Sequence, residues 1–188
     1  ISSGFLLAAF SGTLFAALAV RFVWFGQLLT PMILAIKATP VASFIILALI
    51  WIPSRNLSVF ISFLMVLPVM YTNVLNGIQS TSKDLLEMAR VFSLPAGRTI
   101  RYIYVSQVLP FFRSACTIGL GLCWKSGIAA EVIGIPDGSI GEKLYNAKIF
   151  LNTPDLFAWT LVIVVFSLCF EKLFLKILDT CVEYLERV

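Results

Sequence analysis

The sequence predicts an all-α integral membrane protein with about five transmembrane helices, and two observations carry that prediction. Of its 188 residues, 60% are hydrophobic and only 13% are charged, and the mean hydropathy is +0.97. Soluble domains carry about 25% charged residues, so this chain has too little charge to coat a water-exposed surface of its size. Several apolar runs also reach the length of roughly 20 residues that a helix needs to cross a bilayer core.

Five apolar segments are the predicted spans, and a shorter piece separates the first two. That piece, residues 26–37, contains Pro31 and predicts a short helix or a re-entrant segment. The chain begins at Ile1 with neither an initiator Met nor a basic n-region, so we expect the sequence to begin inside a longer protein. The orientation derived below puts the start of the first span outside, and it therefore predicts a further span upstream. The five predicted spans cover residues 4–25, 41–52, 57–78, 108–124 and 155–170.

Residues 81–110 form a charged island between the third and fourth spans. Thr81 and Asp84 have the spacing of a capping box, which predicts the start of a helix. Leu94-Pro95 predicts a break, because the residue before a proline avoids the α region, and a second helix then returns to the membrane. Loops between packed helices take roughly 2–8 residues, so the island is longer than two neighbouring spans require.

The first island helix has two faces of different chemistry. Apolar side chains recur at the spacing of one helical face, and charged side chains occupy another. An ordinary solvated loop and a docking surface for a protein partner both fit this pattern. The apolar stripe is Leu85, Ala89 and Phe92, and the charged stripe is Lys83, Glu87 and Arg90.

The distribution of Lys and Arg orients the chain, because cytoplasmic loops of membrane proteins carry an excess of both. The island and the C-terminal tail hold most of them, so we expect both on the cytoplasmic side of the cell membrane. That side would hold Lys37, Lys83, Arg90, Arg98, Arg101, Lys172, Lys176 and Arg187, and the other side Arg55, Lys143 and Lys148, with Arg113 and Lys125 unassigned.

The sequence argues against several kinds of chemistry. It has no histidine, and its four cysteines have no metal-ligand spacing, so we expect no metal site. No GxxxxGKS/T phosphate loop occurs, so the chain should neither hydrolyse ATP nor bind a cofactor itself. The basic residues form no dense run with interleaved aromatics, so nucleic acid is not an expected partner.

The island resembles the EAA loop of binding-protein-dependent ABC importer permeases. The matching residues are Glu87-Met88-Ala89, then Ser93, then Ile103. Two positions depart from the family pattern: Ser93 replaces a glycine, and residues 105–106 replace a Leu-Pro that occurs four residues later. Residues 37–51, 119–125 and 129–131 resemble the nitrate, sulfonate and taurine permeases, a group that also includes transporters of thiamine-precursor pyrimidines.

This resemblance implies a single permease domain over residues 1–188, of the type I ABC importer fold, with a cytoplasmic coupling loop at about 79–107. It also implies partners: a second permease subunit in a homodimer, ATPase subunits carrying ATP and Mg, and an extracytoplasmic substrate-binding protein or lipoprotein. The solute would be small and organic or anionic, such as a sulfonate, nitrate or a thiamine precursor. The implied docking residues are Glu87, Ala89, Arg90, Ser93, Ala96 and Gly97, with either Ser93 or Gly97 making the sharp turn.

Polar residues in or beside the spans are candidates for the solute pathway, because intramembrane charges tend to face a cavity or a partner. Lys125 and Glu131 fit two roles: a structural one, with Lys125 snorkelling or paired with Glu131, or a place on the solute route. The stretch 133–148 predicts a loop, and its part 133–145 resembles the outer segment that gates the pathway in relatives. The candidate pathway residues are Trp124, Lys125, Glu131 and Asn73.

Two other classes of membrane protein stay open at this point. A multi-span scaffold with a regulatory loop would carry a similar island. An ion-coupled secondary transporter usually shows internal repeats and intramembrane acids, and neither is evident in the sequence. Co-purification with an ATPase would separate a permease from both.

Overall fold

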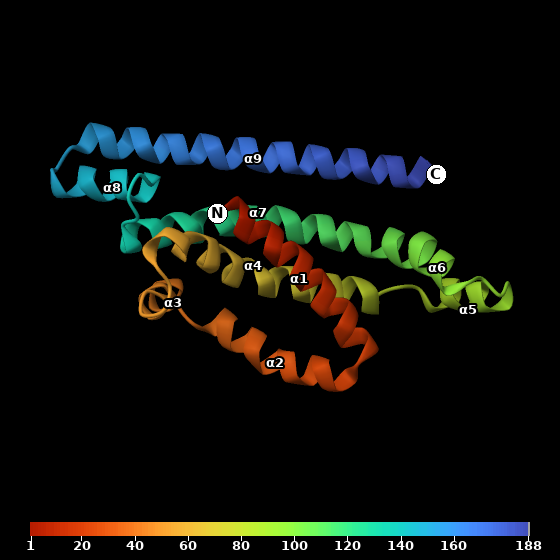
Figure 1. Ribbon diagram of the computed structural model, residues 1–188. Coiled ribbons are helices and arrows are strands. Elements are labelled where there is room, and N and C mark those ends of the chain that lie inside the picture. Colours follow the sequence, from red (N-terminus) through yellow and green to blue (C-terminus); the bar gives the residue numbers. More distant parts are fainter. Residues whose placement is uncertain (188) are drawn as a thin grey trace.

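The computed structural model describes residues 1–187, and within them the chain is helical with no strand. The predicted all-α membrane fold is confirmed. Figure 1 shows the order of the elements. They are α1 (Ser2–Arg21), α2 (Val23–Ala38), α3 (Val41–Ala48), α4 (Ser54–Gln79), α5 (Lys83–Val91), α6 (Ala96–Thr99), the π-helical turn η1 (Ile100–Tyr104), α7 (Val105–Gly134), α8 (Ile140–Ile149) and α9 (Thr153–Arg187).

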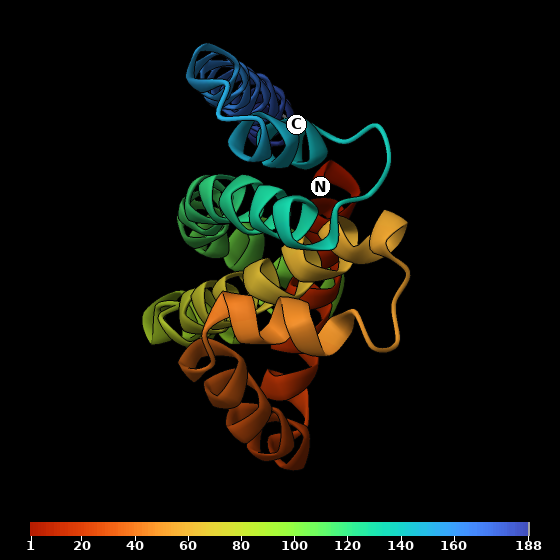
Figure 2. The same ribbon diagram turned by 90° about the vertical axis from the view of Figure 1, so that its left-hand side faces the viewer.

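The helices stack in layers around α4 and α7. Helix α4 packs along α7 on one side and is crossed by α1 on the other. Helices α8 and α9 lie beyond α7, and α2 lies at the opposite side of the stack (Figure 2). The α5–α6 segment lies at one end of the molecule, and α3 and α8 lie at the other (Figure 1).

Small residues allow α1, α4 and α7 to approach closely. A Cβ added at Gly12 of α1 would lie 2.7 Å from the Cβ of Met70 in α4, and one added at Gly77 would lie 3.0 Å from the Phe111 side chain in α7. The buried Ser62 hydroxyl donates a hydrogen bond of 3.0 Å to the Cys123 carbonyl, which links α4 to α7. Close packing and interhelical hydrogen bonds are what hold helices together in lipid.

Within residues 1–187, three helical stretches are long and apolar enough to cross a membrane by themselves: 2–21, 54–79 and 96–134, the last formed by α6, η1 and α7 together. Helices α2 and α3 form a pair bent by 104°, which counts as a fourth if it is one broken span. Residues 41–52 do not form the separate span that we predicted, since α3 has eight residues and rises about 12 Å. The predicted span 155–170 lies within α9, and the count of five stays a prediction.

The close packing of α1 on α4 yields a test with a matched control. Gly12→Ala places a methyl group against Met70, so overpacking should destabilise the protein by about 1–3 kcal/mol. Gly121→Ala makes the same change in α7 where nothing lies within 4 Å, and the higher helix propensity of alanine should leave stability unchanged or raised. Thermal unfolding of the purified protein in detergent compares the two, and equal melting temperatures would contradict this account of the α1–α4 contact.

Candidate functional site

The predicted helix–break–helix is present at one end of the molecule, where α5 is followed by α6 and η1 (Figure 1). Helix α5 has Asp84 in its first turn and Arg90 in its last, a placement that complements the helix dipole. Beyond η1 the chain continues directly into the long helix α7. A π-helical turn at such a junction is uncommon and is often found at functional sites.

Ser93 makes the sharp turn between α5 and α6. Its φ is +50°, in the left-handed region. The Leu94 N–H donates to the Ala89 carbonyl at 2.9 Å, and the Ser93 N–H donates to the Arg90 carbonyl at 3.0 Å. These two bonds form a Schellman motif, in which glycine is the usual residue at the position of Ser93. Gly97 lies inside α6 with open space around it and takes no part in this turn.

The capping box that we predicted at Thr81 and Asp84 is absent. Helix α5 has Ser82 at its N-cap without a side-chain hydrogen bond. The buried Thr81 hydroxyl instead donates to the Gly77 carbonyl at 3.3 Å, because α4 extends to Gln79 and holds Thr81 against its last turn.

A side-chain cap occurs instead at α8, within the stretch that we predicted to be a loop, and it differs from a capping box in that the glutamate bonds to the residue before the N-cap. The Ser139 hydroxyl accepts a hydrogen bond of 3.0 Å from the Glu142 N–H. The Glu142 carboxylate reaches back to accept one of 2.6 Å from the Gly138 N–H. The Ser-x-x-Glu spacing in the sequence carried this signal. The loop prediction is therefore wrong from residue 140 onward, where α8 begins.

The docking residues implied by the family resemblance lie together on the α5–α6 segment, and all of them except Ala89 are exposed. Ala89 is 3% exposed and lies with Leu94, Thr99 and Tyr104 around a small hollow, so it is buried within this segment and η1. Phe92 does not continue the apolar stripe that we predicted along this helix, because α5 ends at Val91 and Phe92 lies in the turn. Val91 and Phe92 are instead 80% and 71% exposed. We call the exposed apolar and aromatic side chains of this segment the docking patch: Met88, Val91, Phe92, Leu94, Ile100 and Tyr102.

The four candidate pathway residues do not form one site. The Asn73 side-chain amide donates to the Val69 carbonyl of its own helix at 2.9 Å. Gly77 packs on Phe111 and Ser62 bonds to Cys123, so Asn73 lies near the start of α7. Residues 124–131 lie near its end. The two regions are separated by more than 10 Å along the helix axis.

Each candidate near the end of α7 has its own surroundings. The Trp124 ring packs edge-on against Phe170 of α9 with centroids 6.0 Å apart, and its buried Nε1 has no partner among the described residues. Glu131 accepts a hydrogen bond of 3.3 Å from the Gly141 N–H at the start of α8. Lys125 is exposed and is not paired with Glu131 in the described part of the chain. Glu131 therefore joins α7 to α8.

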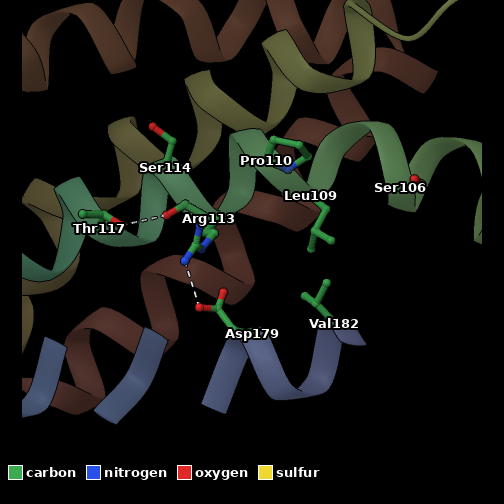
Figure 3. A pocket seen from close by; sticks show the side chains of 8 residues that line it. All are labelled: Ser106, Leu109, Pro110, Arg113, Ser114, Thr117, Asp179 and Val182. Atoms are coloured by element: carbon green, nitrogen blue, oxygen red, sulfur yellow. Dashed lines mark hydrogen bonds and ion pairs between the residues drawn. The ribbon is translucent and has the colours of Figure 1, made fainter. Parts of the chain in front are cut away.

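A second polar feature, which the sequence did not reveal, lies between α7 and α9. Arg113 of α7 donates from Nη2 to Oδ2 of Asp179 at 2.8 Å. The pair lies in an open groove of about 710 Å³ (Figure 3). The distribution of Lys and Arg does not assign Arg113 to either side of the membrane. The signal that could have marked it is a lone arginine three residues after Pro110 within an apolar run.

A bundle of membrane-spanning helices with an exposed helix–turn–helix at one end defines a multi-pass component of a membrane assembly. Among known families, the model for the binding-protein-dependent transport system inner membrane component matches residues 4–182 of this chain. The chain belongs to this family of ABC importer permeases, whose members are non-catalytic components of the cell membrane.

Similar proteins include permeases for different solutes. The chain is 28% identical to the putative aliphatic sulfonates transport permease SsuC of Escherichia coli, over 88% of this chain and 60% of the relative. It is 27% identical to the nitrate import permease NrtB of Synechococcus elongatus, over 78% and 53%. It is 25% identical to the riboflavin transport system permease RibX of Chloroflexus aurantiacus, over 71% and 50%. The chain thus spans between half and two thirds of the length of these relatives.

The left-handed turn at Ser93 predicts a stabilising substitution. A residue with a side chain is destabilised by roughly 1–2 kcal/mol in the left-handed conformation, and glycine avoids this cost. Glycine in turn gives up about 0.5–1 kcal/mol of folding free energy, because its unfolded state has more conformational freedom. Ser93→Gly should therefore stabilise the α5–α6 segment slightly, by up to about 1 kcal/mol. Ser80→Gly is the matched control, because Ser80 has a φ of −82° and glycine should destabilise there. Hydrogen exchange of the α5 amides measures both, and faster exchange in Ser93→Gly would contradict the assignment of the turn.

Proposed function

We propose that this chain is the transmembrane subunit of an ATP-driven ABC importer, and that it docks on an ATPase subunit through the α5–α6 segment. The solute would be a small organic or anionic molecule of the sulfonate, nitrate or thiamine-precursor kind. The observation that carries the docking proposal is the docking patch, a group of large apolar side chains exposed at one end of the molecule. From the Lys and Arg distribution we expect this end on the cytoplasmic side. Exposed apolar patches outside the lipid commonly mark protein interfaces.

The construction of the segment suits the transmission of force. The Schellman turn fixes α6 relative to α5, and the buried Ala89 packs on the α6 and η1 side of the segment, beside Thr99 and Tyr104. Helix α7 follows η1 directly, so movement of the docked segment would be passed into a membrane-spanning helix. Rigid-body coupling of this kind requires a stiff connection between the docking element and the part that moves.

The remaining partners follow from the family and are part of the proposal. ATP and Mg would be bound by two ATPase subunits, and this chain would supply no catalytic group. A second permease subunit, most simply a second copy of the same chain, would complete the pathway. A substrate-binding protein would dock at the opposite end, where α3 and α8 lie (Figure 1). The printed names of the relatives cover sulfonates, nitrate and riboflavin, so they narrow the solute only to small molecules.

The docking patch should be required for capture of the ATPase. Replacing Val91 and Phe92 by serine removes the two most exposed apolar side chains of the patch, and central apolar anchors commonly contribute more than about 1–2 kcal/mol each to an interface. Because about 1.4 kcal/mol of binding free energy corresponds to a tenfold change in affinity, the amount of ATPase that co-purifies should fall at least tenfold. Phe150→Ser is the control, because Phe150 is 78% exposed at the opposite end. Full retention of the ATPase by the double variant would rule out this docking surface and favour a scaffold or a secondary transporter.

Glu87 tests the coupling separately from assembly. Its carboxylate lies exposed on α5 beside the docking patch, so Glu87→Ala should lower solute-stimulated ATP hydrolysis while the ATPase still co-purifies. The expected loss is about tenfold, the size of one charge-assisted hydrogen bond. Asp84→Ala removes an exposed carboxylate one turn earlier and should have a smaller effect. Stimulation equal to wild type in the Glu87 variant would remove Glu87 from the coupling contact.

A further inference from the structure

The groove between α7 and α9 has a charged part and an apolar part (Figure 3). Arg113 reaches from α7 toward Asp179 on α9, and next to them Leu109 and Val182 face each other across the gap. Hydroxyl groups of α7 also border the groove. Its complete lining is Ser106, Leu109, Pro110, Arg113, Ser114, Thr117, Asp179 and Val182.

The ion pair contributes little to holding α9 in place. The Arg113 and Asp179 side chains are 56% and 42% exposed and make one short contact. Exposed pairs of this kind stabilise a protein only slightly. Helix α9 is held against the bundle by aromatic packing instead: the Phe174 ring lies 5.0 Å from that of Phe5 in α1, and Phe170 packs on Trp124. A charge within a spanning helix that is not needed for packing calls for another explanation.

Arg113 has donor capacity to spare. A guanidinium carries five N–H donors in a planar fork that matches an oxyanion, and the pair in the structure uses one short contact. Asp179 is half-exposed, so its carboxylate can turn to water if another anion takes its place. The apolar side chains of Leu109 and Val182 line the same groove and lie beside this pair (Figure 3).

We propose that the α7–α9 groove binds a small organic anion, with its oxyanion head on Arg113 and its apolar part between Leu109 and Val182. Asp179 is the internal competitor, which occupies Arg113 when the groove is empty and is displaced when the anion arrives. Displacement breaks the only ion pair between α7 and α9 in the described residues. The solute interpretation rests on the proposed import function, and an anionic lipid headgroup has the same chemistry.

The position of the groove connects occupancy to the docking end. Arg113 lies nine residues after Tyr104, the last residue of η1, which is about 13 Å along α7. An anion bound at Arg113 therefore lies close to the junction through which the docked segment would move α7. The exchange of Asp179 for an anion replaces a direct contact between α7 and α9 by a contact of each helix with the groove's contents, while the aromatic packing of α9 stays in place.

The exchange of Asp179 for an anion predicts that variants of Arg113 and of Asp179 change the affinity for the anion in opposite directions. We would titrate ethanesulfonate by calorimetry into the purified transporter with its ATPase subunits, in nanodiscs of phosphatidylcholine. Asp179→Asn removes the competitor and should tighten binding about three- to fivefold, whereas Arg113→Ala should weaken it about tenfold or more. Arg113→Lys should be intermediate, because it keeps the charge and loses the fork. Lys172→Gln, an exposed change elsewhere on α9, is the control and should leave affinity unchanged.

The outcomes separate the possible sources of the anion. Opposite shifts for ethanesulfonate support a solute site. If the opposite shifts are seen only for phosphatidylglycerol retained in mixed nanodiscs and detected by native mass spectrometry, they support the same site with a lipid headgroup as its ligand. Equal or same-sign shifts in both variants mean a purely structural pair and overturn the proposal. Co-purification of the ATPase is scored on the same preparations, so failure of the import function is recognised independently of the groove.

Discussion

The close approach of α4 to α7 and α1 is the constraint on which the rest of the structure depends. In lipid there is no hydrophobic driving force that brings apolar helix faces together, because lipid tails are as apolar as the side chains. Helix association therefore relies on van der Waals contact and interhelical hydrogen bonds. Gly12 and Gly77 remove the side chains that would keep the helices apart, and Ser62 bonds to a backbone carbonyl of α7. Because these contacts fix α7 along its length, both of its ends project from a defined frame.

The two ends of α7 carry different tasks. At one end η1 joins it to the docking patch, and at the other Glu131 joins it to α8 through the Gly141 N–H. A helix of 30 residues is about 45 Å long, so α7 alone connects a surface on one side of a membrane to a surface on the other. Under the proposed docking, this continuity would let a partner bound at the docking patch move α7 directly.

The features that the sequence predicted correctly are those set by local composition. The apolar runs and the charged island needed only residue type and spacing, and the helix–break–helix needed only Pro95. The Ser-x-x-Glu spacing before α8 was a local signal that the loop prediction overlooked, and the choice between Ser93 and Gly97 for the turn was left open. Tertiary context decided the role of Thr81 and the pairing of Arg113. The Thr81 hydroxyl donates to the Gly77 carbonyl at the end of α4, so it does not cap α5. Ser93 adopts a left-handed conformation that serine rarely chooses. The Arg113–Asp179 pair joins residues 66 positions apart, and no local pattern reports such a contact.

The polar residues of the spans differ in which parts of the structure their hydrogen bonds join. Asn73 bonds to its own turn of α4, so its loss would leave the helix arrangement intact. Glu131 joins two helices that are consecutive in the chain and already held by a short connection. Arg113 contacts a helix that is otherwise held by aromatic packing further along its length. Among these residues Arg113 is therefore the one that joins two helices distant in the sequence through a contact that a ligand can replace without disturbing the packing that holds them.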